Sequence, residues 1–119
     1  MENKLPRRTE KPWGYELLFA LTPKYAGKVI FVKSGQRLSL QYHKQKDETS
    51  YIYQGKCLLE IEKDGQMVQS ELSSGASFRA APLTKHRIKA IEDTTIFEVS
   101  TPELDDVVRL DDDYGRAKP

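Results

Sequence analysis

The sequence predicts an all-β domain, and two observations carry that prediction. Short runs rich in β-branched and aromatic residues recur along the chain, and each run ends at a turn signal such as KDGQ at 63–66. Apolar residues do not keep a helical spacing over about ten residues anywhere before the C-terminal segment. Eight or nine short strands with this spacing are typical of a sandwich or a barrel, and not of alternating strands and helices.

The expected strands follow one another with short breaks between them. Asp64–Gly65 is a favourable hairpin turn, because glycine adopts a positive φ at little cost. The last fifteen residues, DDVVRLDDDYGRAKP, are compatible with a short helix or an extended tail. The predicted strands are Tyr15–Leu18, Lys28–Lys33, Arg37–His43, Thr49–Tyr53, Lys56–Lys63, Met67–Leu72, Ser77–Ala80, His86–Ala90 and Thr94–Ser100.

Length and composition predict one domain, residues 1–119, without a linker or an internal repeat. A net charge of +1 gives no general attraction to nucleic acid or to an anionic membrane. No apolar run approaches the ~20 residues of a membrane helix, and the charged N-terminus lacks the apolar core of a secretory signal. Cys57 is the single cysteine, so an internal disulfide is excluded. A cytoplasmic location is the simplest expectation.

The strand predicted at Arg37–His43 carries polar residues in an unusual place. Side chains alternate between the two faces of a strand, which puts Leu38, Leu40 and Tyr42 on one face. The other face could simply be exposed to solvent, or in a small barrel it could line an internal cavity. That second face carries Arg37, Ser39, Gln41 and His43.

The spacing of the polar residues favours a face that lines a cavity over one that is exposed to solvent. Gln41, His43 and Glu48 lie between turn glycines, and a strand and the start of the next strand can bring their side chains together. The second histidine of the chain, His86, also begins a predicted strand, after a loop that contains Pro82. Two imidazoles, a carboxylate and an amide oxygen are a suitable ligand set for a divalent transition metal. We therefore expect Gln41, His43, Glu48 and His86 to form a metal site.

These residues resemble the two conserved motifs of the cupins. Residues 35–55 resemble the first motif, G-x5-H-x-H-x3–4-E-x6-G, with Gln41 in place of the first histidine. Residues 75–90 resemble the second motif, G-x5-P-x-G-x2-H-x3-N, with His86 as the ligand. Here the proline is displaced by one position, the inner glycine is missing, and Ala90 stands in place of asparagine.

The resemblance is closer to one group, the C-terminal cupin domain of type II mannose-6-phosphate isomerases, and it covers residues 11–116. That group usually has arginine where this chain has Lys46, and tryptophan where it has Tyr51. The resemblance implies a single-domain cupin, a double-stranded β-helix or jelly-roll barrel. The matching segments are KPWGYELL, SGQRLSLQYH, KHR, FEVS and DDVVRLDDDYGR.

The resemblance implies a metal-dependent aldose–ketose isomerase that acts on a sugar phosphate of the mannose 6-phosphate type. It implies a divalent metal, with zinc expected first and manganese, iron, nickel or cobalt as alternatives. The reaction needs a base, for which Lys46, Glu98 and Lys85 are candidates, since a buried lysine can lose its proton near neutral pH. It also needs a phosphate anchor, for which guanidinium groups are well suited. The candidate anchors are Arg37, Arg87 and Arg116.

Two other functions stay open at this point. Two histidines and a carboxylate are also the ligand set of non-haem iron oxygenases. A cupin can also hold a sugar or nucleotide sugar without turnover. We further expect a homodimer, because pairing or exchanging an N-terminal strand across subunits would cover exposed sheet edges and the apolar side chains of the 37–43 strand.

Overall fold

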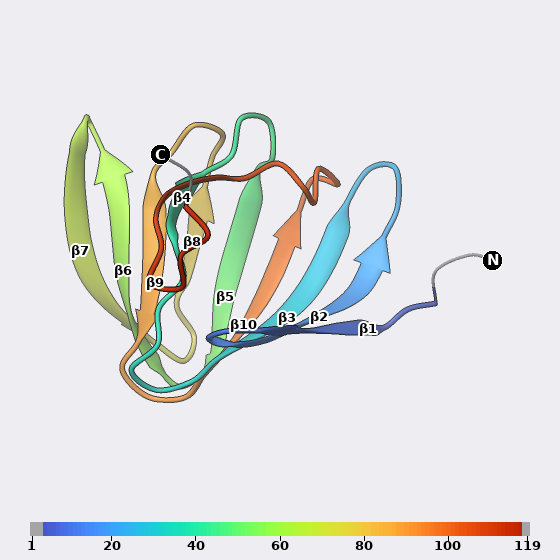
Figure 1. The fold of residues 1–119 in the computed structure, drawn as a ribbon, viewed down its shortest axis with the longest axis horizontal. Coiled ribbons are helices and arrows are strands. Elements are labelled where there is room, and N and C mark those ends of the chain that lie inside the picture. The colour runs from blue at the N-terminus through green and yellow to red at the C-terminus, as the bar shows by residue number, and fades with distance from the viewer. Residues whose placement is uncertain (1–3, 118–119) are drawn as a thin grey trace.

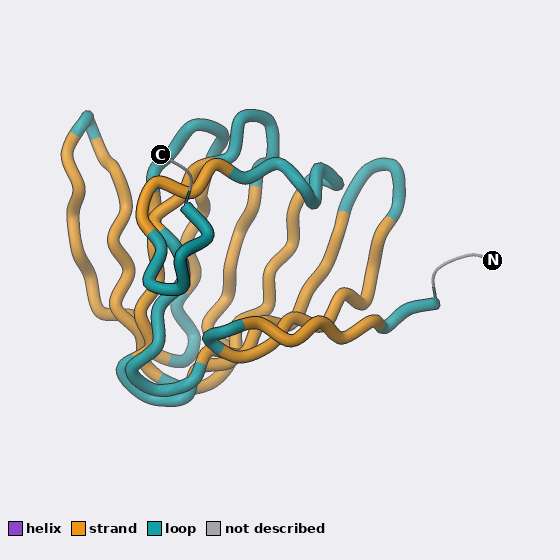
Figure 2. Tube along the Cα trace, viewed as in Figure 1, coloured by secondary structure: helices purple, strands orange, loops and turns teal. Residues whose placement is uncertain are grey.

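The computed structural model describes residues 4–117, which form eleven strands and no helix (Figures 1 and 2). No helix in this part of the chain is therefore available to cross a membrane. The strands form two antiparallel sheets, with orders β1-β2-β3-β10-β5-β8 and β11-β4-β9-β6-β7. The strands are β1 (Arg7–Lys11), β2 (Gly14–Leu21), β3 (Ala26–Val32), β4 (Leu40–Tyr42), β5 (Glu48–Gln54), β6 (Lys56–Lys63), β7 (Gln66–Ser73), β8 (Ser77–Ala80), β9 (His86–Ala90), β10 (Thr94–Ser100) and β11 (Val108–Asp111).

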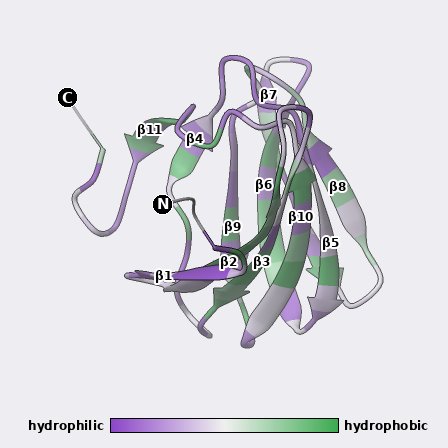
Figure 3. Ribbon diagram, turned by 90° about the vertical axis from the view of Figure 1, so that its right-hand side faces the viewer, coloured by the Kyte–Doolittle hydropathy of each residue, from purple (hydrophilic) through white to green (hydrophobic). Residues whose placement is uncertain are grey.

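The nine predicted strands are all present, and their order and hairpins confirm an all-β jelly roll. Two strands were not predicted. β1 has the sequence RRTEK, whose charges hide any alternation of apolar residues, and Figure 3 shows it as hydrophilic. β11 lies in the C-terminal segment and pairs with β4, which decides between the helix and the extended tail.

The strand predicted at Arg37–His43 is shorter than expected. Only Leu40–Tyr42 forms a strand, and Arg37 makes an isolated bridge with Lys89. The predicted alternation fails at Leu38, which packs against the core and lines the same cavity as Gln41. Two residues an odd number apart can share a face here because the backbone before Leu40 does not follow a regular strand.

The interior between the sheets has an apolar half and a polar half. The apolar half contains Trp13, Val32, Ile52, Cys57 and Ile88, all buried. Along the same strands the inward positions then become polar. β10 continues from Ile96 to Glu98, β5 from Ile52 to Glu48, and β9 from Ile88 to His86.

The outer face of the six-stranded sheet is free of charged residues over its central strands β3, β10 and β5. Phe97 of β10 is paired in register with Tyr51 of β5 and Val29 of β3, so these side chains lie in one row. The ring of Tyr53 stacks on Phe97 with centroids 4.7 Å apart. Outward positions of the central strands β3, β10 and β5 carry no Lys, Arg, Asp or Glu within residues 26–32, 94–100 and 48–54. We call this surface, made by Phe19, Tyr51, Tyr53, Phe97 and Val99, the outer patch.

Candidate metal centre

The polar half of the interior is a cavity of about 120 Å³ between the two sheets. Five basic and three acidic side chains line it, together with both histidines and Gln41. A cavity with such a dense set of ionisable groups is uncommon in a structural core, where buried charges are costly unless paired. The lining therefore makes the cavity the candidate functional site.

His43, Glu48 and His86 converge at the bottom of this cavity. His43 follows β4, while Glu48 and His86 begin β5 and β9, so three neighbouring chain segments supply them. Nε2 of His43 lies 3.1 Å from Oε1 of Glu48, and Nε2 of His86 lies 3.5 Å from Oε2. One ligand atom from each residue lies within 4.8 Å of the others, and all three side chains are buried. This spacing is suitable for a single metal ion.

Backbone carbonyls orient both imidazoles toward that point. Nδ1 of His43 donates to the carbonyl of Asp106 at 2.5 Å, and Nδ1 of His86 donates to the carbonyl of Thr84 at 2.9 Å. With Nδ1 held by a carbonyl, Nε2 is the nitrogen of each ring that faces Glu48. Metal-binding histidines are usually held in this way by a partner on the other ring nitrogen. The donor set and its orientation therefore fit a divalent metal.

Electrostatics support a carboxylate at position 48. Burial raises the pKa of Glu48, but hydrogen bonds from His43 and His86 and the charge of Lys46 outweigh it, so the pKa falls well below its usual value. Burial lowers the pKa of His43, and the hydrogen bond and charge of Glu48 more than offset this, so the pKa is raised. An anionic Glu48 is the form that binds a metal.

Gln41 enters the same cavity from β4. Its Cα pairs in register with that of His86 on the adjacent β9, and the residue lines the cavity. Side chains of directly paired residues lie on the same face of a sheet, so the amide faces the cavity next to the imidazole of His86. Gln41 thus lies in the same cavity, on the strand next to His86.

Lys46 and Glu98 form a second buried cluster beside Glu48. Nζ of Lys46 lies 3.1 Å from Glu48 and 3.3 Å from Glu98. Burial lowers the pKa of Lys46, but Glu98 and Glu48 raise it by a larger amount, so the lysine keeps its proton. The idea that burial makes Lys46 a neutral base does not fit this environment. For Glu98, burial and the charge of Glu48 raise the pKa above its usual value.

The remaining candidates from the sequence lie elsewhere or already have partners. Lys85 is exposed and does not line the cavity. The three proposed phosphate anchors are each bound by one residue of the Asp111–Asp113 run. Arg37 makes two hydrogen bonds to Asp113 at 2.7 and 2.8 Å, Arg87 contacts Asp111 at 3.2 Å, and Arg116 makes two bonds of 2.9 Å to Asp112.

Sequence reasoning missed several residues that build the site. The carboxylate of Asp106 accepts backbone N–H bonds from Lys44, Gln45 and Lys46 at 2.7–2.9 Å and so holds the loop between His43 and Glu48. Hydrogen bonds from those amides lower its pKa to about 2. Only the DDVVR segment of the resemblance pointed to this residue. The cavity is also lined by Lys11, Glu16, Lys28 and Arg109. All but Lys28 lie in segments that carry the resemblance, but none was chosen as a site residue.

Comparison with known families agrees with this geometry. The family model described as mannose-6-phosphate isomerase C-terminal matches residues 1–112. The chain belongs to this cupin family. A comparison with curated proteins found no match.

Solved structures show the same cupin fold. KdgF from Halomonas sp. is 25% identical with a TM-score of 0.73, and the match covers 83% of this chain and 88% of that one. Oxalate decarboxylase from Bacillus subtilis is 17% identical with a TM-score of 0.77, over 89% of this chain and 30% of that one. The capsular polysaccharide assembling protein CapF from Staphylococcus aureus is 17% identical with a TM-score of 0.73, over 88% and 34%. This cupin therefore spans about a third of the length of the last two proteins.

Proposed function

We propose that this cupin is a metal-dependent isomerase that interconverts an aldose and a ketose phosphate of the mannose 6-phosphate type. The observation that supports it best is the convergence of His43, Glu48 and His86 in a cavity that also holds the buried carboxyl of Glu98. The family membership supports the substrate class.

The metal would be held by His43, Glu48, His86 and Gln41, and zinc is the first expectation. When bound, it would supply Lewis acidity to the carbonyl and hydroxyl oxygens of the open-chain sugar. Glu98 acts as the base in this proposal. It removes the proton from C2 of the aldose and returns it to C1, while the proton of the C2 hydroxyl passes to the C1 oxygen, so that no atom is gained or lost. Lys46 stays protonated and orients the carboxylates of Glu48 and Glu98.

The first test is metal content, measured on untagged protein purified without added metal, together with an isomerase assay on mannose 6-phosphate. Near-stoichiometric metal and turnover, both lost in His43→Ala, are expected. His43→Ala removes one ligand and leaves the apolar half of the interior intact. Protein that stays metal-free after reconstitution would contradict the proposal, and so would metal-loaded protein that does not turn over any hexose phosphate.

The ligand set itself favours one second candidate. Two histidines and one carboxylate around a cavity are also the ligands of non-haem iron oxygenases. Bound iron with oxygen consumption, and no isomerisation, would favour that reaction. Ligand-induced stabilisation without any product would instead favour a binding cupin.

We also propose that two copies pair through the outer patch. Its residues are 38–58% exposed, and together they leave roughly 500 Å² of mostly apolar surface on each copy. Two such patches would bury about 1,000 Å², the least that a stable interface needs. A patch without charges of its own can pack on itself around a two-fold axis without like-charge repulsion. β1 pairs with β2 of its own chain, so exchange of this strand is not needed.

Light scattering at micromolar concentration tests this pairing. A dimer mass is expected for the wild type and a monomer mass for Val99→Lys, which places a charge in the middle of the patch. Glu71→Lys on the exposed strand β7 is the matched control and should leave the dimer unchanged. A monomeric wild type would contradict the pairing.

A further inference from the structure

Two basic side chains at the cavity have no counter-charge. Lys28 pairs with Glu16 at 2.9 Å, Lys46 lies between Glu48 and Glu98, and Arg87 is bound by Asp111. These pairs use all three acidic side chains that line the cavity. Lys11 and Arg109 remain, and neither side chain makes an ion pair or hydrogen bond with another residue in the part of the chain that the structure describes.

Arg109 lies in the same cross-strand row as His86 of the candidate metal centre. It pairs in register with Gln41, and Gln41 pairs with His86 on the next strand. The three residues therefore form one row on the cavity face of β11, β4 and β9. Adjacent strands are about 4.8 Å apart, which places the backbone of Arg109 roughly 10 Å from that of His86.

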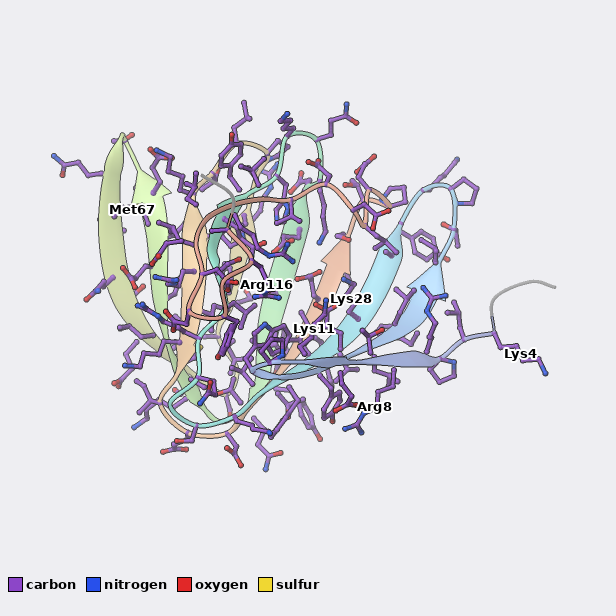
Figure 4. All side chains as sticks on the ribbon, in the orientation of Figure 1. Lys4, Arg8, Lys11, Lys28, Met67 and Arg116 are labelled. Carbon is purple, nitrogen blue, oxygen red and sulfur yellow. The ribbon has the colours of Figure 1, made fainter. Side chains whose placement is uncertain are left out.

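Lys11 approaches the same place from the opposite sheet. It ends β1, next to the turn into β2, and it lines the main cavity together with Arg109. Both residues also line an adjoining cavity of about 60 Å³, which Trp13 and Gln41 share. In Figure 4 Lys11 lies near Lys28 and Arg116 over the centre of the fold, whereas Arg8 of the same strand points away.

The C-terminal segment supplies carboxylates to other arginines but not to Arg109. Asp111, Asp112 and Asp113 neutralise three other arginines, but Arg109 of the same segment receives no carboxylate. Two half-buried cations that face one cavity repel each other, and an anion between them would relieve that repulsion. A guanidinium binds phosphate or carboxylate oxygens with two parallel hydrogen bonds, and lysine adds a further charge.

We propose that Lys11 and Arg109 form the subsite that binds the anionic group of an open-chain sugar, a phosphate or a carboxylate, whose other end lies at His43, Glu48 and His86. This inference rests on the proposed function. The backbone separation of roughly 10 Å between Arg109 and His86 suits a ligand that carries its anionic group at the far end of a six-carbon chain. Arg109 and Lys11 thus replace Arg37, Arg87 and Arg116 as the anchors.

Binding to the full-length, metal-loaded protein tests the subsite, with the fluorescence of Trp13 as a reporter inside the adjoining cavity. The probes are mannose 6-phosphate, glucuronate and neutral mannose. Arg109→Gln should lower the affinity for the anionic probe by roughly 10–100-fold, as expected for the loss of hydrogen bonds to a charged group. It should leave the metal content unchanged. Lys11→Gln should act in the same direction with a smaller effect. Arg8→Gln, on the opposite face of β1, is the matched control.

Each outcome decides the inference. Loss of mannose 6-phosphate binding identifies a phosphate subsite, and loss of glucuronate binding identifies a carboxylate subsite. Wild-type affinity in both Arg109→Gln and Lys11→Gln, or equal affinity for neutral mannose, would overturn it. Anion binding that depends on Arg109 but yields no product supports the subsite and rejects the isomerase. Turnover with an unchanged KM in Arg109→Gln supports the isomerase and rejects the subsite.

Discussion

The two halves of the interior are built on the same strands and have opposite properties. In the apolar half, Ile52, Ile96 and Val32 are almost completely buried among other apolar side chains. In the polar half, Glu48, Glu98 and Lys46 are buried to nearly the same extent and depend on one another for charge balance. Burial in the first half stabilises the fold, whereas burial in the second half costs stability and tunes the pKa values of the site. The difference shows that one strand can serve both purposes when its inward residues change partway along.

The largest expected effect is on catalysis and comes from a substitution in the polar half of the interior. Glu98→Gln should lower kcat for isomerisation by about 10²–10⁴-fold, because an amide cannot exchange the proton. Metal content should stay at the wild-type level, since Glu98 is not a ligand in this proposal. The measurement is a steady-state assay beside metal analysis. Phe97→Leu, at the neighbouring outward position, is the matched control. Equal activity in the two variants would contradict the role of Glu98 as the base and the functional difference between the two halves.

The converse change lies in the apolar half. Ile52→Ala should lower the free energy of unfolding by about 2–5 kcal/mol, because it leaves a cavity among residues that cannot collapse around it. Chemical denaturation with urea measures this. At a temperature where the variant remains folded, metal stoichiometry should be unchanged. A variant that is stable but cannot hold metal would show that the halves are not independent.

Acid should destabilise the polar half of the metal-free protein first. The pKa of Glu48 is lowered in the fold, as is that of Asp106, to about 2, so each contributes stability that is present above its unfolded pKa and lost as the pH falls. Unfolding free energy should therefore decrease from about pH 4.5 toward pH 2. Asp106→Asn should lower the free energy of unfolding by about 1–2 kcal/mol at pH 7. It should also reduce the further loss of stability as the pH falls. Asp105→Asn, at an exposed neighbouring position, serves as the control. If the unfolding free energy falls with pH equally steeply in both variants, Asp106 does not make the expected contribution.

The smallest effect concerns the loop before His86. Leu83 has a φ of +69°, its side chain is 64% exposed, and its N–H donates to the carbonyl of His43. A leucine pays roughly 1 kcal/mol for this left-handed conformation, which glycine adopts freely. Leu83→Gly should raise thermal stability by about that amount without a change in metal affinity. Thermal unfolding that is unchanged or lowered would indicate that the leucine side chain makes a favourable contact of its own.

The sequence predicted more of the fold than of the site, and the residues show why. Alternation and turn signals located nine strands, since each is a local property. β1 escaped because an edge strand made of charged residues has no apolar period. Spacing together with the cupin motifs pointed to His43, Glu48 and His86, which the structure brings together. The missing glycine of the second motif is explained by Leu83, which takes the backbone conformation that the glycine would have taken.

The arginine proposed to bind an anion could not be chosen from the sequence, because an arginine is available for a ligand only if no carboxylate of the protein already binds it. Arg37, Arg87 and Arg116 each carry the right chemistry, but whether a carboxylate already occupies them follows from contacts such as Arg37 to Asp113, which are 76 positions apart. Arg109 has the same chemistry and lies within the same motif. Only the register of β11 against β4 shows that it faces the cavity.

The C-terminal segment has a consequence for the order of events during synthesis. It supplies the Asp106 carbonyl that orients His43 and the carboxylate that holds the following loop. A nascent chain in which this segment is still inside the ribosome can pair most of its strands, but it lacks the partners that aim one of the three ligands. If the site takes up a metal as proposed, all three side chains are in place for the ion only after residues 105–116 have been translated.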